Sequence, residues 1–156
     1  MIIKVKKSNS SIPTPKYAIE GDAGLDLTAV QILKSDYKSV VYDTGLAFEI
    51  REGYIGFIYP RSSVRKYDLI MANSVGVVDS NYRGSIQVSF KRTLSGSLKY
   101  LLNSIGFKTN LREYELGDRV CQLIILPYPQ IELKVVEEEL TETKRGEGGH
   151  GSTGNK

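Results

Sequence analysis

The sequence predicts an all-β protein built as a sandwich or jelly roll, and two observations support this prediction. Short apolar or alternating runs recur along the chain between turn residues such as Gly and Asp, and only two segments have helical spacing. In residues 85–90, which read Ser-Ile-Gln-Val-Ser-Phe, every second residue is apolar, as expected of a half-buried strand. Many short strands of this kind favour packed or closed sheets.

The predicted elements follow from these runs in chain order. We expect strands over residues 2–5, 25–29, 40–42, 46–50, 54–59, 69–71, 85–90, 120–126 and 131–136. Residues 62–67 could form a short turn of helix capped by Ser62, and residues 97–105 carry apolar side chains at helical spacing. A hairpin over residues 73–84 would explain the glycines of that segment.

Composition limits the number of domains and the chemistry. The chain has 156 residues, 40% hydrophobic and 25% charged, which suits one compact domain with a modest core and room for a tail. The single Cys121 cannot form an internal disulfide, and we expect it to pack in a buried strand. The single His150 excludes a histidine-rich zinc site. Any metal must therefore prefer oxygen ligands.

Hydropathy and charge indicate a soluble intracellular protein. The longest apolar stretch, residues 120–126, is far shorter than the roughly 20 residues of a membrane helix, and residues 1–7 lack the apolar run of a signal peptide. We therefore expect no membrane association and a cytoplasmic location, or the cytoplasm or nucleus of the host cell for a viral protein. The net charge of +3 suits an anionic partner without indicating nucleic acid.

The composition changes at the end of the chain. Residues 141–156 contain no hydrophobic residue and five glycines. Such a segment cannot bury enough apolar surface to offset the entropy of ordering it, so we expect a mobile arm after a β domain of residues 1–140. A solvated tail is the simpler interpretation, and an arm whose glycine amides wrap an anion is the sharper one.

Two nucleotide-binding patterns occur in this arm, but their context excludes both. Residues 146–151 match G-x-G-x-x-G, yet the preceding strand and the following helix that this motif needs are missing from the sequence pattern. Residues 149–154 begin like a P-loop, with Asn155 where the lysine should stand. The glycines still allow the backbone to approach a phosphate closely.

A segment rich in anion-binding groups follows one predicted strand. Arg61, Ser62 and Ser63 place a guanidinium and two hydroxyls at the start of the possible short helix, which suits an oxyanion or phosphate. A capped turn with a surface arginine is the alternative.

Aspartates mark two further candidate sites. Asp79 lies in residues 73–84 together with Asn, Tyr and Arg, the mixture expected where a base, a sugar and a water are held together. Asp22 and Asp26 could hold a hydrated magnesium ion, although each could also be a turn residue.

Five segments, in this order, resemble the five motifs of the trimeric dUTPases. They are residues 23–27, 60–63, 76–84, 117–124 and 145–154, which extend from near the start of the chain to its last residues. The resemblance implies a jelly-roll protomer of the β-clip type and a homotrimer with three active sites at subunit interfaces. It also implies hydrolysis of dUTP to dUMP and pyrophosphate with Mg²⁺, which limits uracil in DNA and supplies dUMP for thymidylate synthesis.

The resemblance further implies roles for individual residues. Asp79 would activate the attacking water, and Asp26 would hold Mg²⁺ through water. Tyr82 would pack on the deoxyribose and exclude a 2′-hydroxyl. The phosphates would be contacted by Arg61, Ser62, Ser63 and Gln122, and the uracil edge by Asn73, Gly76 and Val78. In the arm of a neighbouring subunit, Arg145, Ser152 and Thr153 would close on the γ-phosphate, and His150 and Gly151 would also contact the substrate.

The chain departs from the family pattern at two places. His150 stands where most relatives carry the Phe that stacks on uracil. Because a neutral imidazole can also stack, we expect activity to be retained, with weaker closure when the ring is protonated; an unimportant loop histidine is the alternative. Residues 91–113 are longer than expected and basic. A solvated surface insertion is one interpretation, and a regulatory arm that binds a protein partner is the other.

Three other functions compete with dUTP hydrolysis. The related dCTP deaminases share the Arg-Ser-Ser element but need a glutamate where this chain has Ser89. A nucleotide-responsive regulatory protein could act through residues 91–113. A nucleic-acid binder would interleave basic and aromatic residues on one face, whereas the ten Tyr residues are scattered among the predicted strands, so we expect no nucleic-acid partner.

Overall fold

The computed structural model describes residues 1–149, in which ten strands and two helices are formed. The strands are β1 (Lys4–Lys7), β2 (Leu25–Thr28), β3 (Gln31–Ser35), β4 (Ser39–Asp43), β5 (Leu46–Glu49), β6 (Tyr54–Pro60), β7 (Leu69–Met71), β8 (Gly76–Val78), β9 (Gln87–Arg92) and β10 (Arg119–Pro127). A 3-10 helix, η1, covers Ser62–Lys66, and an α-helix, α1, covers Leu94–Ser104.

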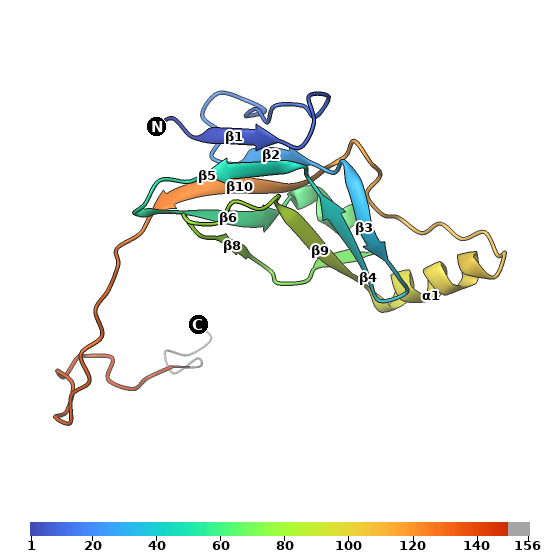
Figure 1. Ribbon diagram of the computed structural model, residues 1–156. Coiled ribbons are helices and arrows are strands. Elements are labelled where there is room, and N and C mark those ends of the chain that lie inside the picture. Colours follow the sequence, from blue (N-terminus) through green and yellow to red (C-terminus); the bar gives the residue numbers. More distant parts are fainter. Residues whose placement is uncertain (150–156) are drawn as a thin grey trace.

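Two four-stranded antiparallel sheets form the body of the molecule (Figure 1). The first sheet has the strand order β2-β10-β6-β8 and the second has the order β3-β4-β9-β7, while β1 and β5 form a separate two-stranded ribbon. Consecutive strands such as β7 and β8 lie in different sheets, so the chain crosses repeatedly between the layers. The all-β prediction is confirmed.

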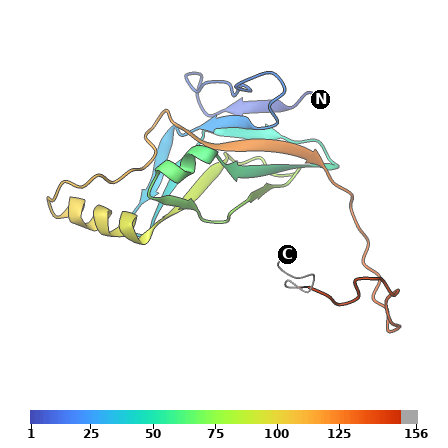
Figure 2. The same ribbon diagram turned by 180° about the vertical axis from the view of Figure 1, so that it is seen from behind.

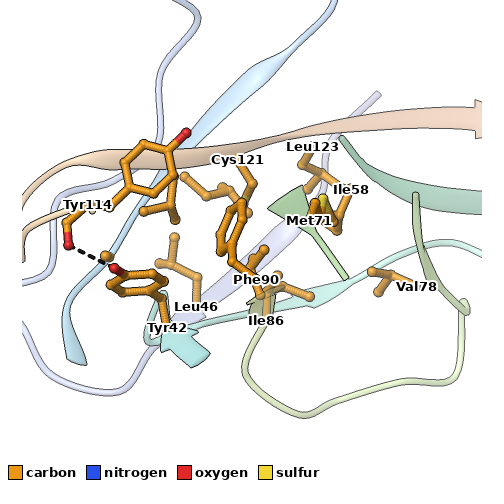
Figure 3. Packing of buried hydrophobic residues seen from close by; sticks show 14 of the residues in the cluster. Tyr42, Leu46, Ile58, Met71, Val78, Ile86, Phe90, Tyr114, Cys121 and Leu123 are labelled. Atoms are coloured by element: carbon orange, nitrogen blue, oxygen red, sulfur yellow. Dashed lines mark hydrogen bonds between the residues drawn. The ribbon is translucent and has the colours of Figure 1, made fainter. Parts of the chain in front are cut away.

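The core lies between the sheets because alternate residues of each strand point inward. In β4 the buried residues are Val40 and Tyr42, and in β9 they include Val88 and Phe90. The Tyr42 hydroxyl donates a hydrogen bond of 2.8 Å to the carbonyl oxygen of Tyr114, which satisfies its polar atom inside the core (Figure 3). Aromatic side chains thus join the second sheet to the segment that precedes β10.

Most of the predicted elements are present. Eight of the nine expected strands match observed ones, and the expected helix over residues 97–105 exists but begins earlier, at Leu94. The Thr93 hydroxyl accepts a hydrogen bond of 3.0 Å from the Gly96 amide, and this cap fixes the start of the helix. The unexpected strands are β3, whose residues are all exposed and interrupted by a bulge, and the three-residue β8.

Three sequence predictions are wrong. Residues 131–136 form no strand, because no strand of the described chain pairs with them and their side chains are exposed. Ser62 is not the cap of η1, since Arg61 holds that position without a side-chain capping bond. Residues 73–84 do not form a hairpin, because β8 pairs with β6 of the first sheet and not with a strand of its own loop.

The segment after β10 leaves the sandwich, as both ribbon views show (Figures 1 and 2). Residues 128–149 contain no helix or strand, and they depart from the end of the molecule opposite to α1. The division into a β domain of residues 1–140 and an arm therefore stays a prediction. No helix within residues 1–149 is long and apolar enough to cross a membrane.

Cys121 provides a test of the packing of β10. Its side chain is fully buried, and this burial raises the pKa of the thiol to about 12. The thiol therefore stays protonated at pH 8, whereas the thiolate is the nucleophile. We predict that iodoacetamide at pH 8 leaves the native protein unmodified and alkylates the urea-unfolded chain completely, as measured by intact-protein mass spectrometry. Rapid labelling of the native protein would show that β10 is not buried as described.

Candidate active site

A pocket of about 200 Å³ lies beside β8, between the first sheet and the loop that leads into β9. It is smaller than the roughly 300–1,000 Å³ of sites that hold drug-sized ligands, so it suits one ring of a nucleotide. The structure brings five of the residues singled out in the sequence into the lining of this base pocket: Asn73, Gly76, Val78, Asp79 and Tyr82.

The turn between β7 and β8 shapes one wall of the base pocket. Ser74 adopts a left-handed backbone conformation, with φ of 59°, and its amide donates a hydrogen bond of 3.3 Å to the Met71 carbonyl. A Cβ atom at Gly76 would lie 3.1 Å from Cβ of Ile58 and 3.4 Å from Nδ2 of Asn73. The glycine thus allows β8 to lie against β6 and leaves space for the Asn73 amide.

Buried apolar side chains lie beneath the base pocket, and Asn73, Asp79, Tyr82, Ser85 and Gln87 add polar groups to its lining. Ile58, Met71, Val78 and Ile86 are buried beneath it. The Asn73 amide carries both donors and an acceptor, which are the groups needed to bind the edge of a pyrimidine. Apolar walls with a small number of polar groups are the usual composition of a site that orients a flat ring.

Asp79 and Tyr82 stand at the two ends of one turn at the mouth of the pocket. The Tyr82 amide donates a hydrogen bond of 3.1 Å to the Asp79 carbonyl, and the Tyr82 hydroxyl donates one of 3.1 Å to the carbonyl of Ser85. A Cβ atom at Gly84 would lie 2.6 Å from Cζ of Tyr82, so only glycine lets the ring fold back onto its own loop. The carboxylate of Asp79 is exposed beside this ring.

A second group of predicted residues gathers around Asp26 at the end of β6. Arg61 Nε lies 2.7 Å from Asp26 Oδ1, and Arg119 Nη1 lies 2.9 Å from Asp26 Oδ2. The Asp26 side chain is only 11% exposed, so these ion pairs are partly shielded from water. Arg61 Nη1 also donates to the Ser63 hydroxyl at 3.4 Å. Two guanidinium groups and one carboxylate leave a net positive charge, which suits an anion.

Gln122 joins this anion cluster from β10. Its register places it opposite Asp26 of β2 and Tyr59 of β6, and its Nε2 donates a hydrogen bond of 3.1 Å to the Pro60 carbonyl. A Cβ atom at Gly24 would lie 2.2 Å from Gln122 Oε1, so the amide lies in the space that the glycine leaves open. Ser62 is exposed at the first residue of η1, next to the cluster.

Tyr114 packs close to this region. Its ring centroid lies 4.0 Å from that of Tyr67, the residue that follows η1, and burial raises the pKa of the Tyr114 hydroxyl. The phenol therefore stays neutral at physiological pH and serves as packing behind η1.

The base pocket and the anion cluster remain separate in a single chain. Within residues 1–149, no hydrogen bond or ion pair joins the two groups, and they line no common pocket. Asp26 and Arg119 instead border a different cavity of about 390 Å³, which residues 12–18 help to line. One chain alone therefore does not bring Asp79 and Arg61 into the same site.

The residues predicted for the arm do not complete either group. Arg145 Nε donates a hydrogen bond of 2.8 Å to the Gly148 carbonyl, within its own segment. His150, Gly151, Ser152 and Thr153 lie outside the described residues.

The described residues fit Mg²⁺ only as an ion carried by phosphates. This ion keeps several waters and is typically bound by one or two carboxylates together with substrate phosphates. Residues 1–149 contain no cluster of three His, Cys, Asp or Glu that could hold a metal directly. Asp22 accepts a hydrogen bond from the Ile19 amide and serves its own turn. Both oxygens of Asp26 accept from arginines, which leaves room for contact through water but not for a resident metal site.

Sequence reasoning missed part of the site. Arg119 lies in one of the five motif segments, but its role depends on the pairing of β10 with β2, which places it opposite Thr28. The sequence predicts Ile58 and Met71 only as strand residues, whereas in the structure both line the base pocket. The alternation of inward and outward side chains along β6 could have shown that Ile58 points inward. It could not have shown that a pocket lies beside this residue.

The chain is similar to known proteins over nearly its whole length. A family model described as dUTPase matches residues 9–97. The deoxyuridine 5'-triphosphate nucleotidohydrolase of Escherichia phage T5 is 36% identical, with 99% of this chain and all of the relative covered. The protein of the same name from Nautilia profundicola is also 36% identical, with 99% of both covered.

A solved structure supports the same assignment over nearly the whole fold. The dUTPase of Staphylococcus bacteriophage 80alpha, solved with dUPNHPP, superposes with a TM-score of 0.79 and 26% identity, and 98% of each chain is covered. The chain therefore belongs to the dUTPase family.

Proposed function

We propose that the protein hydrolyses dUTP to dUMP and pyrophosphate, with Mg²⁺ bound to the triphosphate. The observation that best supports this function is the base pocket, which places an amide, an exposed carboxylate and a tyrosine ring around a cavity of single-ring size. The names of the phage T5 and Nautilia relatives, and the dUPNHPP complex of the phage 80alpha dUTPase, support the choice of dUTP.

Substrate selection is proposed to depend on the shape of the base pocket. Asn73 and the adjacent backbone would bind the uracil edge, while the apolar walls would leave no space for the methyl group of thymine. Tyr82 would cover the deoxyribose, because its ring is held at the pocket mouth by Gly84 and Ser85. A 2′-hydroxyl would meet this ring, which would disfavour UTP.

The chemical step is proposed to use Asp79 as the general base. Its exposed carboxylate would accept a proton from a water that attacks the α-phosphorus, and pyrophosphate would leave. Arg61, Arg119, Ser63 and Gln122 would bind the phosphates, with the positive charge of the anion cluster opposing the charge of the triphosphate. Mg²⁺, when bound to the phosphates, neutralises part of the same charge.

A homotrimer is proposed to complete the site. The base pocket of one subunit and the anion cluster of another would meet at an interface, and the arm with Arg145 would come from a neighbouring subunit. The outer face of the first sheet supports an assembly, since Val77, Phe57 and Ile124 lie opposite one another across β8, β6 and β10. Val77 is 60% exposed, so this row is open to a partner.

Residues 131–136 give a second reason to expect assembly. They alternate between apolar and charged residues at first, as a strand does, yet they pair with no strand of their own chain. Ile131 and Leu133 are 77% and 83% exposed. The edge of a sheet in another subunit would satisfy both the backbone and these side chains.

Replacement of Asp79 by Asn tests the proposed chemistry. We predict that pyrophosphate release from dUTP with Mg²⁺ falls by roughly 10²- to 10⁴-fold, while the affinity for dUPNHPP changes little, because the amide keeps the shape but cannot accept the proton. Glu20→Gln, which neutralises an exposed carboxylate outside both groups, should leave the rate unchanged.

Parallel assays with dTTP, dCTP and UTP test the specificity. Only dUTP should turn over rapidly. Comparable turnover of dCTP or UTP, or an active Asp79→Asn enzyme, would overturn the proposed function.

The proposed homotrimer predicts a solution mass of three 17.4 kDa chains by light scattering. Leu126→Lys places a charge on the apolar outer face, where Leu126 pairs with Ile55 and is 44% exposed, so the variant should shift toward the mass of one chain with unchanged circular dichroism. Leu33→Lys, at a position 43% exposed on β3, should keep the wild-type mass. A wild-type protein that is monomeric at assay concentrations would exclude this assembly.

His150 predicts a pH dependence of substrate binding. If its ring stacks on uracil, the KM for dUTP should rise as the pH falls through about 6.5, because the charged imidazolium must lose its hydration to stack. His150→Phe should remove most of this rise between pH 5.5 and 8, whereas titration of the phosphates affects both enzymes equally. Identical pH profiles for the two proteins would refute the stacking role.

A further inference from the structure

Helix α1 presents its apolar side to solvent. Leu94, Leu98 and Leu101, with Ile105 directly after the helix, follow one another at intervals of four, three and four residues, which places them on one face. Their exposed fractions are 90%, 58%, 45% and 69%. We call these four residues the apolar stripe. A helix on the surface of a globular protein normally buries such a stripe against its core.

The polar side of α1 is the side attached to the protein. Lys99 Nζ lies 3.1 Å from both carboxylate oxygens of Asp68, and the Tyr100 ring packs under the guanidinium of Arg92 at 4.1 Å. A Cβ atom at Gly96 would lie 2.7 Å from the Asp68 carbonyl oxygen, so the helix approaches the body of the protein closely here. These contacts fix the rotation of the helix and keep the stripe outward.

Arg92 anchors residues 91–113, the segment that carries α1, at its base. Its side chain is fully buried, forms an ion pair with Glu113, and donates hydrogen bonds of 2.6 Å to the Ser39 carbonyl and 3.0 Å to the Ser35 hydroxyl. Because Arg92 precedes α1 and Glu113 follows it, the ion pair ties both ends of this segment together. The stripe is therefore presented on a firmly attached helix.

The unpaired charges of the segment that carries α1 have one sign. Residues 91–112 contain five basic residues and no acidic one. Arg92 and Lys99 are neutralised by Glu113 and Asp68, whereas Lys91, Lys108 and Arg112 are exposed and form no ion pair with any residue of the described chain. These three cations lie before and after the helix in the sequence.

We propose that α1 is a docking surface for an acidic amphipathic helix of another protein. The stripe extends over roughly 17 Å, or three helical turns, which matches the apolar face of a short partner helix. Acidic residues toward the ends of that helix would pair with Lys91, Lys108 and Arg112. This surface is separate from the base pocket and the anion cluster, and the inference extends beyond dUTP hydrolysis.

The charges favour this partner over two other occupants. A second copy of the chain docked stripe to stripe would bring two sets of unpaired cations together. A membrane surface attracts helices whose basic residues flank the apolar face, but Lys99, the only basic residue within α1, points to Asp68.

A direct binding test uses three labelled peptides of about 18 residues, or five helical turns. One carries Leu at the spacing of a helical stripe with Glu at the flanks, the second has Lys in place of Glu, and the third has the Glu and Leu residues rearranged to alternate. We expect saturable binding of the first peptide by fluorescence polarisation, at least about tenfold tighter than of the other two. Leu98→Glu combined with Leu101→Glu should weaken it by about tenfold or more.

The controls separate this surface from catalysis and from general effects of charge. Leu98 and Leu101 belong to neither proposed substrate-binding group, so the double variant should hydrolyse dUTP at the wild-type rate. Leu33→Glu adds one charge at a position 43% exposed, close to the 45% of Leu101, and should keep the affinity for the acidic peptide. Binding to vesicles of phosphatidylserine and phosphatidylcholine tests a membrane as the occupant of the stripe. Light scattering of the wild type and the double variant tests a second copy of the chain.

Three results would overturn the inference. The first is that the acidic peptide does not bind saturably. The second is that the protein binds vesicles and not the peptide, and that the double variant loses this vesicle binding. The third is that the protein self-associates and the double variant does not. Because hydrolysis is measured on the same samples, failure of the docking proposal is distinguishable from failure of the proposed function.

Discussion

The pairing of β10 with both β2 and β6 is the constraint on which the candidate site depends. This register sets Gln122 between Asp26 and Tyr59, so residues distant in sequence meet at one end of the first sheet. A slip of one residue would reverse the faces of β10, turning the buried Cys121 outward and Gln122 into the core. The next pairing, of β6 with β8, places Gly76 opposite Ile58 and so forms the base pocket. Both halves of the site are thus consequences of strand register in one sheet.

The anion cluster is organised before any anion binds. Asp26 fixes the positions of two guanidinium groups, and their long side chains would otherwise lose conformational freedom when a phosphate is bound. One carboxylate neutralises only one of the two cations, so one positive charge remains. The Asp26 side chain is shielded from water, which strengthens these ion pairs relative to those of an exposed aspartate. The arrangement combines preorganised side chains with a residual positive charge, which is what the proposed binding of phosphates requires.

Local sequence patterns predicted the strands that have one clearly buried face. They failed for segments whose structure depends on contacts with residues distant in the sequence. The alternation in β9 and the apolar run of β10 identified both strands, because each has one clearly buried set of side chains. Nothing in the five exposed residues of β3 distinguishes them from a loop, and residues 131–136 show that alternation alone does not make a strand without a neighbouring edge. In the site, the loop of Asp79 was found from its composition, whereas the role of Arg119 required the register of β10. Helical spacing located the apolar face of α1 but not its outward direction, which depends on Asp68 and Arg92.

Residues 91–113 show how the proposed docking surface and the candidate site can coexist on a small fold. This segment leaves the second sheet at Arg92 and returns to the first sheet through Tyr114, whose ring packs on Tyr67 beside η1. The segment that carries the apolar stripe thus ends close to η1 and the anion cluster. Closeness alone does not couple two sites, because coupling requires a connecting element with two alternative conformations. The buried Arg92 guanidinium holds the base of this segment through Glu113 and backbone carbonyls, and these contacts do not involve the apolar stripe. A partner bound to the apolar stripe therefore does not have to displace Tyr114. The register of β10, and with it the anion cluster, can stay unchanged while α1 binds the partner.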